Sequence, residues 1–230
     1  MIRAILLDIE GTTTPIAFVH EVLFAYARAH VKEFLLNNAD EARADITLLR
    51  EEQATDVSNG EQPPPAIDDY VEWLIARDRK STGLKSLQGK IWRQGYSNGS
   101  LKSQVYADVP PAFARWHASG LSINIFSSGS VLAQQLLFAH TDAGDLTKFI
   151  DQYFDTNVGK KGDAESYRKI ASALNLPAEE VLFISDVVAE LQAASEAGMQ
   201  TLLSLRPGNQ PQEHADIYRA IDSFAQIEMF

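Results

Sequence analysis

The sequence predicts an α/β protein in which an all-helical insert follows the first strand of a parallel sheet. Three observations support this prediction. A short apolar run opens the chain at residues 2–7. The stretch that follows, at residues 16–107, shows only helical periodicity. From about residue 108, apolar runs of strand length alternate with helical patterns. Strands that alternate with helices imply right-handed crossovers, and therefore a parallel sheet covered by helices.

The first strand delivers an acidic residue to its carboxyl end. Residues 2–7 are apolar enough for a strand buried on both faces, and Asp8 follows directly. Open α/β sheets bind their ligands at this end of their strands. Glu10 comes two residues later and, in extended chain, returns to the same side, while Gly11 allows a tight turn. Taken alone, this pattern also describes a strand end followed by a solvated turn.

The insert is expected to be a compact helical cap at residues 16–107. Apolar residues recur at three- and four-residue intervals between residues 18 and 53, and this spacing resumes between residues 70 and 92. The stretch 56–66 contains Asn-Gly and three consecutive prolines, which break helices, so it is predicted to be a loop.

The rest of the sheet is expected after residue 108, so that residues 1–15 and 108–230 form the α/β core. Two prolines, at 110 and 111, suit the start of a helix that ends near Gly120. Further strands are predicted at 122–126, 153–154, 181–185 and 201–205. Further helices are predicted at 132–138, 164–174, 187–197 and 213–224.

The composition limits the partners to be expected. Net charge is −11, from 20 basic and 31 acidic residues, whereas nucleic acids and anionic membranes select clustered Lys and Arg. No cysteine is present, which excludes disulfides, thiolate metal sites and a cysteine nucleophile. The sequence contains no apolar run near the roughly 20 residues of a membrane span and no recognisable signal peptide. A cytoplasmic monomer without nucleic-acid or membrane partners is therefore expected.

Polar residues also follow the other predicted strands. Ser127 and Ser128 precede a helix, so their hydroxyl and N–H groups could bind phosphate oxygens, although the same sequence suits a helix-capping turn. Lys160 and Lys161 lie in a glycine-containing loop, where they are either solvated or directed at the strand ends.

A further acidic residue, Asp186, follows the strand 181–185. It can be read as a metal ligand or as the N-cap of the next helix. Glu190 lies four residues later, near the same face of that helix.

Together these side chains supply what phosphoryl transfer requires. Asp8 can attack phosphorus and form an aspartyl-phosphate, and Glu10 can exchange a proton with the leaving oxygen. Mg²⁺ prefers oxygen ligands and would suit Asp8 and Asp186, with a carbonyl from Glu10. Ser128 and Lys161 can neutralise the phosphoryl oxygens.

These motifs resemble the four motifs of the haloacid dehalogenase superfamily. The resemblance narrows to the acireductone-forming enolase-phosphatases of methionine salvage. It is carried by Asp8–Phe18 (DIEGTTTPIAF), Phe126–Ser130 (FSSGS), Ser166–Ile170 (SYRKI, after Gly159-Lys160-Lys161), the stretch Leu87-Gln88-Gly89 through Trp92, and Arg206-Pro207-Gly208-Asn209. Glu10 is specific to this group, since most relatives in the superfamily have Asp at that position.

The resemblance implies a Rossmann-like core of the haloacid dehalogenase type and a bifunctional hydrolase with one Mg²⁺ per subunit. The enzyme would enolise 2,3-diketo-5-methylthiopentyl-1-phosphate, a small phosphorylated diketone. It would then hydrolyse the enol phosphate to 1,2-dihydroxy-3-keto-5-methylthiopentene (acireductone) and phosphate. The implied residues are Asp8, Glu10 and Lys161 for catalysis, Ser127, Ser128 and Lys161 for substrate, and Asp8, Glu10 and Asp186 for the metal.

Two alternative functions fit the same motifs. One is a phosphatase of the superfamily that acts on another small phosphate ester without enolase activity. The other is a non-catalytic phosphate-binding module. Glu10 argues against a dehalogenase, because cleavage of a carbon–halogen bond requires no proton shuttle.

Overall fold

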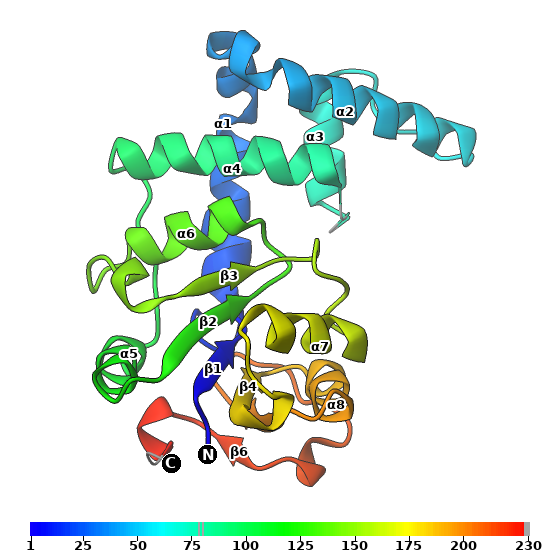
Figure 1. Cartoon of the computed structure of the whole chain (residues 1–230). Coiled ribbons are helices and arrows are strands. Elements are labelled where there is room, and N and C mark those ends of the chain that lie inside the picture. The colour runs from blue at the N-terminus through cyan, green and yellow to red at the C-terminus, as the bar shows by residue number, and fades with distance from the viewer. Residues whose placement is uncertain (78, 80, 228–230) are drawn as a thin grey trace. The chain divides into compact units, whose positions relative to one another are not determined.

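The protein, described here by a computed structural model of residues 1–77, 79 and 81–227, divides into two compact units. One unit combines Met1–Val19 with Lys102–Phe230, and the other is His20–Leu101. The first unit contains a sheet between helices, and the second contains a group of helices (Figure 1).

A fully parallel, six-stranded sheet forms the centre of the first unit, which confirms the predicted fold class. Its strand order is β3-β2-β1-β4-β5-β6. The strands are β1 (Ala4–Leu7), β2 (Ser122–Phe126), β3 (Gln152–Phe154), β4 (Val181–Ser185), β5 (Gln200–Ser204) and β6 (Ala220–Ile221). In a doubly wound sheet of this order, the direction of winding reverses between the first and fourth strands, and ligands bind beside that reversal.

The register of the central strands brings three loops to one edge of the sheet. Leu7, the last residue of β1, pairs with Ile125 of β2 and with Ile184 of β4. Because these strands are parallel, the residues that follow them emerge side by side.

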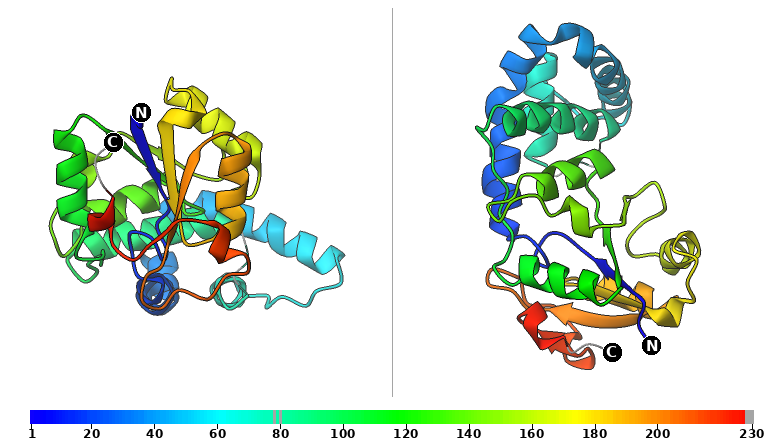
Figure 2. Two further views of the ribbon diagram at one scale, coloured as in Figure 1. Left: turned by 90° about the horizontal axis from the view of Figure 1, so that it is seen from below. Right: turned by 60° about the vertical axis from the view of Figure 1, so that its left-hand side comes forward.

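Helices cover both faces of the sheet. Alternate residues of β1 point to opposite faces, and Ala4 and Leu6 belong to the apolar cluster that α7 and α8 complete. The helices α5 and α6 lie on the other side of the sheet (Figures 1 and 2). The helices are α5 (Val109–Ala118), α6 (Val131–Ala139), α7 (Ala164–Ala173) and α8 (Val188–Glu196), with short 3-10 turns η2 (Thr147–Phe149), η3 (Ala178–Glu180), η4 (Ala215–Ile217) and η5 (Phe224–Gln226).

The prediction of a helix at 213–224 is wrong. This segment instead contains the edge strand β6, which lies between the 3-10 turns η4 and η5. The main-chain N–H groups of Leu203 and Leu205 donate to the carbonyls of Arg219 and Ile221, at 2.9 and 2.8 Å. His214 has a left-handed φ of 59°, which an α-helix does not accommodate. The pairing with β5 therefore overrides the local helical spacing.

The second unit contains four α-helices and no strand among its described residues. They are α1 (Phe24–Asn37), α2 (Ala39–Ser58), α3 (Ile67–Ile75) and α4 (Thr82–Ser97), preceded by a π-helical turn η1 (Phe18–Leu23). The helix α4 packs closely on α2, because a Cβ on Gly83 would lie 2.9 Å from Cγ of Leu49. An ion pair of 2.6 Å joins the half-buried Lys90 to the buried Asp45 across the same two helices. No helix in the described ranges has the length and apolarity to cross a bilayer.

A buried arginine ties the C-terminal segment of the first unit to the turn after β1. Arg206 Nε donates to the carbonyl of Thr12 at 3.2 Å, and the guanidinium forms an ion pair of 2.9 Å with Asp108. The rings of Tyr106 and Phe224 lie 4.7 and 4.6 Å from Arg206 Cζ. Burial alone would raise the pKa of Asp108, but hydrogen bonds from Arg206 and the Phe224 N–H lower it below its ordinary value of 3.8.

The Asp108→Asn variant should lose about 3 kcal/mol of unfolding free energy at neutral pH, because it leaves a buried guanidinium without its counter-charge. A carboxylate with a lowered pKa stabilises the fold above its unfolded pKa, and this contribution disappears as pH falls through its folded pKa. The deficit should therefore stay constant from about pH 7 to pH 5 and shrink below about pH 4. Urea titrations across this range measure it, with the exposed Asp142→Asn as control. A deficit that grew on acidification would contradict this account.

Candidate active site

The candidate site begins with Asp8, a buried carboxylate directly after β1. Its main-chain N–H donates to Ile184 of β4 at 3.0 Å, so the residue keeps its place at the edge of the sheet. A tight turn follows, in which the N–H of Gly11 donates to the carbonyl of Thr14 at 2.8 Å. Gly11 has a φ of +67°, a conformation that glycine adopts without a steric penalty.

Lys161 brings a positive charge to this carboxylate. Its Nζ lies 2.5 Å from Asp8 Oδ1 and 2.6 Å from Glu190 Oε2, and its side chain is only 9% exposed. The hydroxyl of Tyr167 donates to the main-chain carbonyl of Lys161 at 2.8 Å, which fixes the start of the side chain. Burial would lower the pKa of Lys161, but the two carboxylates outweigh it and raise this pKa.

The two neighbouring lysines of the sequence therefore lie in different environments. Lys160 is exposed, and its carbonyl accepts a hydrogen bond of 2.7 Å from Ser166 Oγ. The structure brings Lys161 alone of this pair to Asp8.

Asp186 follows β4 and is also buried. The N-cap position of α8 is occupied by Val187, so Asp186 does not serve as the cap that the sequence also allowed. Burial, together with the nearby charges of Asp8 and Glu190, raises the pKa of Asp186 to about 7, against the opposing effect of Lys161.

Glu190 is the site residue to which sequence reasoning assigned no role. It accepts a hydrogen bond of 2.9 Å from Ser185 Oγ, in addition to its ion pair with Lys161. Burial raises its pKa, while Lys161 acts in the opposite direction. Its spacing of four from Asp186 was the available signal, but only the fold places Lys161 beside it.

The loop after β2 presents the predicted serines. Ser127 is buried, and its Oγ accepts a hydrogen bond of 3.2 Å from the N–H of Gly129. Ser130 is the N-cap of α6, where its Oγ accepts from the N–H of Ala133 at 3.3 Å. The capping function therefore belongs to Ser130, while Ser128 is half-buried on the same turn.

Glu10 lies in the turn after β1. It is half-buried and forms a β-bridge with Thr14. It stands two residues from Asp8 and one residue before Gly11.

The charges of this site suit a divalent cation. Three carboxylates, Asp8, Asp186 and Glu190, influence one another around the single ammonium of Lys161, so negative charge is in excess. Within the described ranges, no three His, Cys, Asp or Glu side chains form a complete metal cluster. A cation held here would therefore need main-chain and water oxygens as well, a ligand set that Mg²⁺ accepts.

A close approach of backbone to side chain lies at the centre of this arrangement. A Cβ on Gly11 would overlap Asp186 Oδ2 and would lie 2.8 Å from Asn209 Oδ1. The turn after β1 can therefore approach Asp186 this closely only because residue 11 is glycine.

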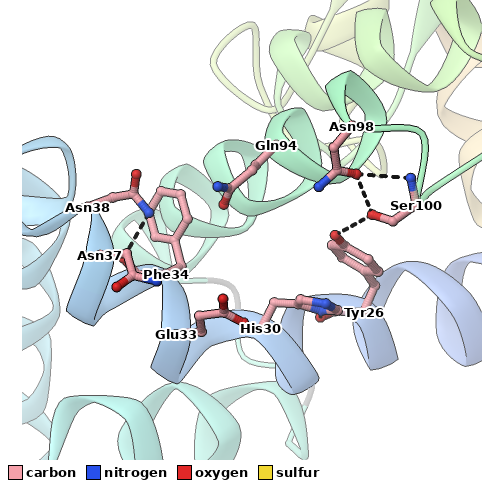
Figure 3. Close-up of a pocket in the computed structure, with 9 residues that line it drawn as sticks. All are labelled: Tyr26, His30, Glu33, Phe34, Asn37, Asn38, Gln94, Asn98 and Ser100. Carbon is pink, nitrogen blue, oxygen red and sulfur yellow. Dashed lines mark hydrogen bonds between the residues drawn. The ribbon is translucent and has the colours of Figure 1, made fainter.

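The helical unit has a cleft of its own between α1 and α4, with a volume of about 240 Å³ (Figure 3). On one side Tyr26 stacks on His30, with ring centroids 3.9 Å apart, and its hydroxyl contacts Ser100 Oγ at 2.8 Å. The described residues that line this cleft include Glu33 but neither lysine nor arginine. The described lining of this cleft therefore offers a phosphate no lysine or arginine, whereas the site at the strand ends has Lys161.

Comparison with known proteins agrees with this fold. Residues 2–198 match the family model of the haloacid dehalogenase-like hydrolases. The chain is 55% identical to enolase-phosphatase E1 of Synechococcus elongatus over 98% of both chains. It is 44% identical to a probable bifunctional methylthioribulose-1-phosphate dehydratase/enolase-phosphatase E1 of Populus trichocarpa, covering 98% of this chain and 47% of that protein.

Among solved structures, the UTR4 protein of Saccharomyces cerevisiae superposes with a TM-score of 0.82 at 34% identity. The match covers 99% of this chain and 100% of the yeast chain.

The chain thus belongs to the haloacid dehalogenase-like hydrolases and, within them, to the enolase-phosphatase E1 family. It is a hydrolase of the phosphatase type.

The Gly11→Ala variant should lose both stability and phosphatase activity, because its methyl group would displace Asp186. Gly144→Ala is the matched control, since Gly144 also has a positive φ, of +92°, but no atom within 4 Å of an added Cβ. The control should lose about 1 kcal/mol from backbone strain alone and keep its activity, and Gly11→Ala should lose at least about twice as much. Urea unfolding and phosphate release measure the two effects. Equal losses in the two variants would contradict the proposed crowding.

Proposed function

We propose that this protein is a bifunctional, Mg²⁺-dependent enolase-phosphatase of methionine salvage. Its substrate would be 2,3-diketo-5-methylthiopentyl-1-phosphate, and its products acireductone and phosphate. The α/β unit is assigned to catalysis, with the helical unit as its cap. Membership of the enolase-phosphatase E1 family supports the reaction, and the buried contact between Lys161 and Asp8 is the observation that carries the mechanism.

Asp8 is proposed as the nucleophile. Lys161 occupies its Oδ1, which leaves the other carboxylate oxygen to attack phosphorus. As the new O–P bond forms, the P–O bond to the ester oxygen breaks, and Glu10 gives its proton to that oxygen. Glu10 then takes a proton from the water that hydrolyses the aspartyl-phosphate, and both side chains return to their starting states.

The phosphoryl oxygens are proposed to lie between the loops after β1 and β2. Ser127 and Ser128 would donate hydrogen bonds to them, and Lys161 would offset their charge. Glu190 and Tyr167 do not need to touch the substrate, because they hold the two ends of the lysine residue.

Magnesium fits the same group of residues. Asp8 and Asp186 would provide carboxylate oxygens, and Glu10 would provide its main-chain carbonyl. When bound, Mg²⁺ would act as an electrophile for the phosphoryl oxygens and for an enolate oxygen. Enolisation also requires a base beside the carbonyl, and Glu10 is the candidate by position.

The decisive test is to incubate the purified enzyme and Mg²⁺ with the diketone phosphate. Enol absorbance should rise before phosphate appears, a chelator should abolish phosphate release, and added Mg²⁺ should restore it. Asp8→Asn should release no phosphate. Release from other phosphate esters, without turnover of the diketone, would instead identify a phosphatase of different specificity.

A second test separates the two adjacent lysines. Lys161→Ala should lower phosphate release by at least about a hundredfold, because it removes the cation beside the transferring group. Lys160→Ala should retain native activity, since the Lys160 side chain is on the surface. Rates under saturating substrate measure both variants. Equal activity of the two would refute the assignment.

A further inference from the structure

Asn209 lies at the candidate active site, but the proposed reaction assigns it no role. It lies after β5, and its Nδ2 donates to the carbonyl of Gly11 at 2.9 Å and to the carbonyl of Ser204 at 3.1 Å. Ser204 Oγ also donates to the Gly11 carbonyl, at 3.0 Å. Two side chains from the β5 region thus hold the turn that passes close to Asp186.

The orientation of the Asn209 amide is fixed by these partners. Gly11 and Ser204 present carbonyl oxygens, which accept hydrogen bonds and cannot donate them. A reversed amide would place its oxygen against both carbonyls and lose both hydrogen bonds. The NH₂ group therefore faces the backbone, and the amide oxygen faces the opposite way.

That oxygen lies in the neighbourhood of the carboxylate of Asp186. Asn209 Oδ1 is buried and has no hydrogen-bond partner among the described residues. A Cβ on Gly11 would lie 2.8 Å from this oxygen and would overlap Asp186 Oδ2, so both oxygens border the same small volume. Two acceptors that border one buried volume repel each other, and a donor or a cation placed in that volume relieves the repulsion.

We propose that Asn209 is a positioning residue for the divalent cation, and that its Oδ1 accepts a hydrogen bond from water bound to that cation beside Asp186. This inference rests on the proposed function, because it presupposes Mg²⁺ at the site. Mg²⁺ retains several of its waters in proteins, and those waters need acceptors. An amide oxygen meets this need without adding another negative charge to the three carboxylates.

Three variants separate this function from a purely structural one. Asn209→Leu removes both the acceptor and the donors. Asn209→Asp removes the two donated hydrogen bonds but keeps an acceptor beside Asp186. Ser204→Ala removes only the second hydrogen bond to the Gly11 carbonyl. Calorimetric titration with MgCl₂ in the absence of substrate gives the dissociation constant, and melting without Mg²⁺ reports the structural effect.

In Asn209→Leu, the Mg²⁺ dissociation constant should rise about tenfold, which is typical for the loss of an outer-shell partner. Asn209→Asp should bind Mg²⁺ at least as tightly as the native protein, despite a lower melting temperature. Ser204→Ala should stay within about twofold of native affinity, because it leaves the acceptor in place.

Native affinity in Asn209→Leu would overturn the inference while leaving the proposed function intact. The same would follow if Asn209→Leu and Asn209→Asp lost affinity equally, because the tether to Gly11 would then explain both. If Asn209→Asp does not fold, the contrast between Asn209→Leu and Ser204→Ala decides. Failure of the native protein to bind Mg²⁺ would instead refute the magnesium site of the proposed function, and this inference with it.

Discussion

The contact on which the site depends is the buried ammonium of Lys161 between two carboxylates. Asp8 follows β1 and Glu190 belongs to α8, and Lys161 reaches them at 2.5 and 2.6 Å. Each of these charges would cost several kcal/mol to bury alone, and the ion pairs offset that cost. The contact therefore joins the start of the chain, the loop before α7 and the start of α8 in one arrangement.

Hydrogen bonds from other side chains of the first unit hold Lys161 and Glu190 in position. Tyr167 in α7 fixes the backbone of Lys161, and Ser185 at the end of β4 orients Glu190. On the other side of the site, Arg206 and Asn209 hold the carbonyls of the turn after β1. The turn is thus attached at several points, which limits its movement when a charged substrate binds.

One lysine does not balance the carboxylates that surround it. The raised pKa of Asp186, about 7, is the consequence of burial and of its two acidic neighbours. The same excess of negative charge would attract a divalent cation. This balance suits the proposed function, in which the site would hold a cation and then a dianionic phosphate, since a site already neutral would bind the cation weakly.

Much of this protein can be derived from its sequence. The apolar run before Asp8, the helical spacing of the insert and the alternation after residue 108 predicted a parallel α/β sheet, because hydrophobic periodicity is a local property. The helix predicted at 213–224 was wrong, because part of this segment pairs with β5. Local periodicity does not record such a pairing with another strand.

For the site, the sequence by itself determined which carboxylates, hydroxyls and lysines follow the strands. The resemblance to a known family already implied Lys161 rather than Lys160, and the tertiary structure placed Lys161 against Asp8. Only the tertiary structure paired Lys161 with Glu190 and brought the Asn209 amide oxygen near Asp186. These outcomes depend on side chains from different strands that meet at one edge of the sheet. Distances between such residues are set by strand order and register, which no single stretch of sequence contains.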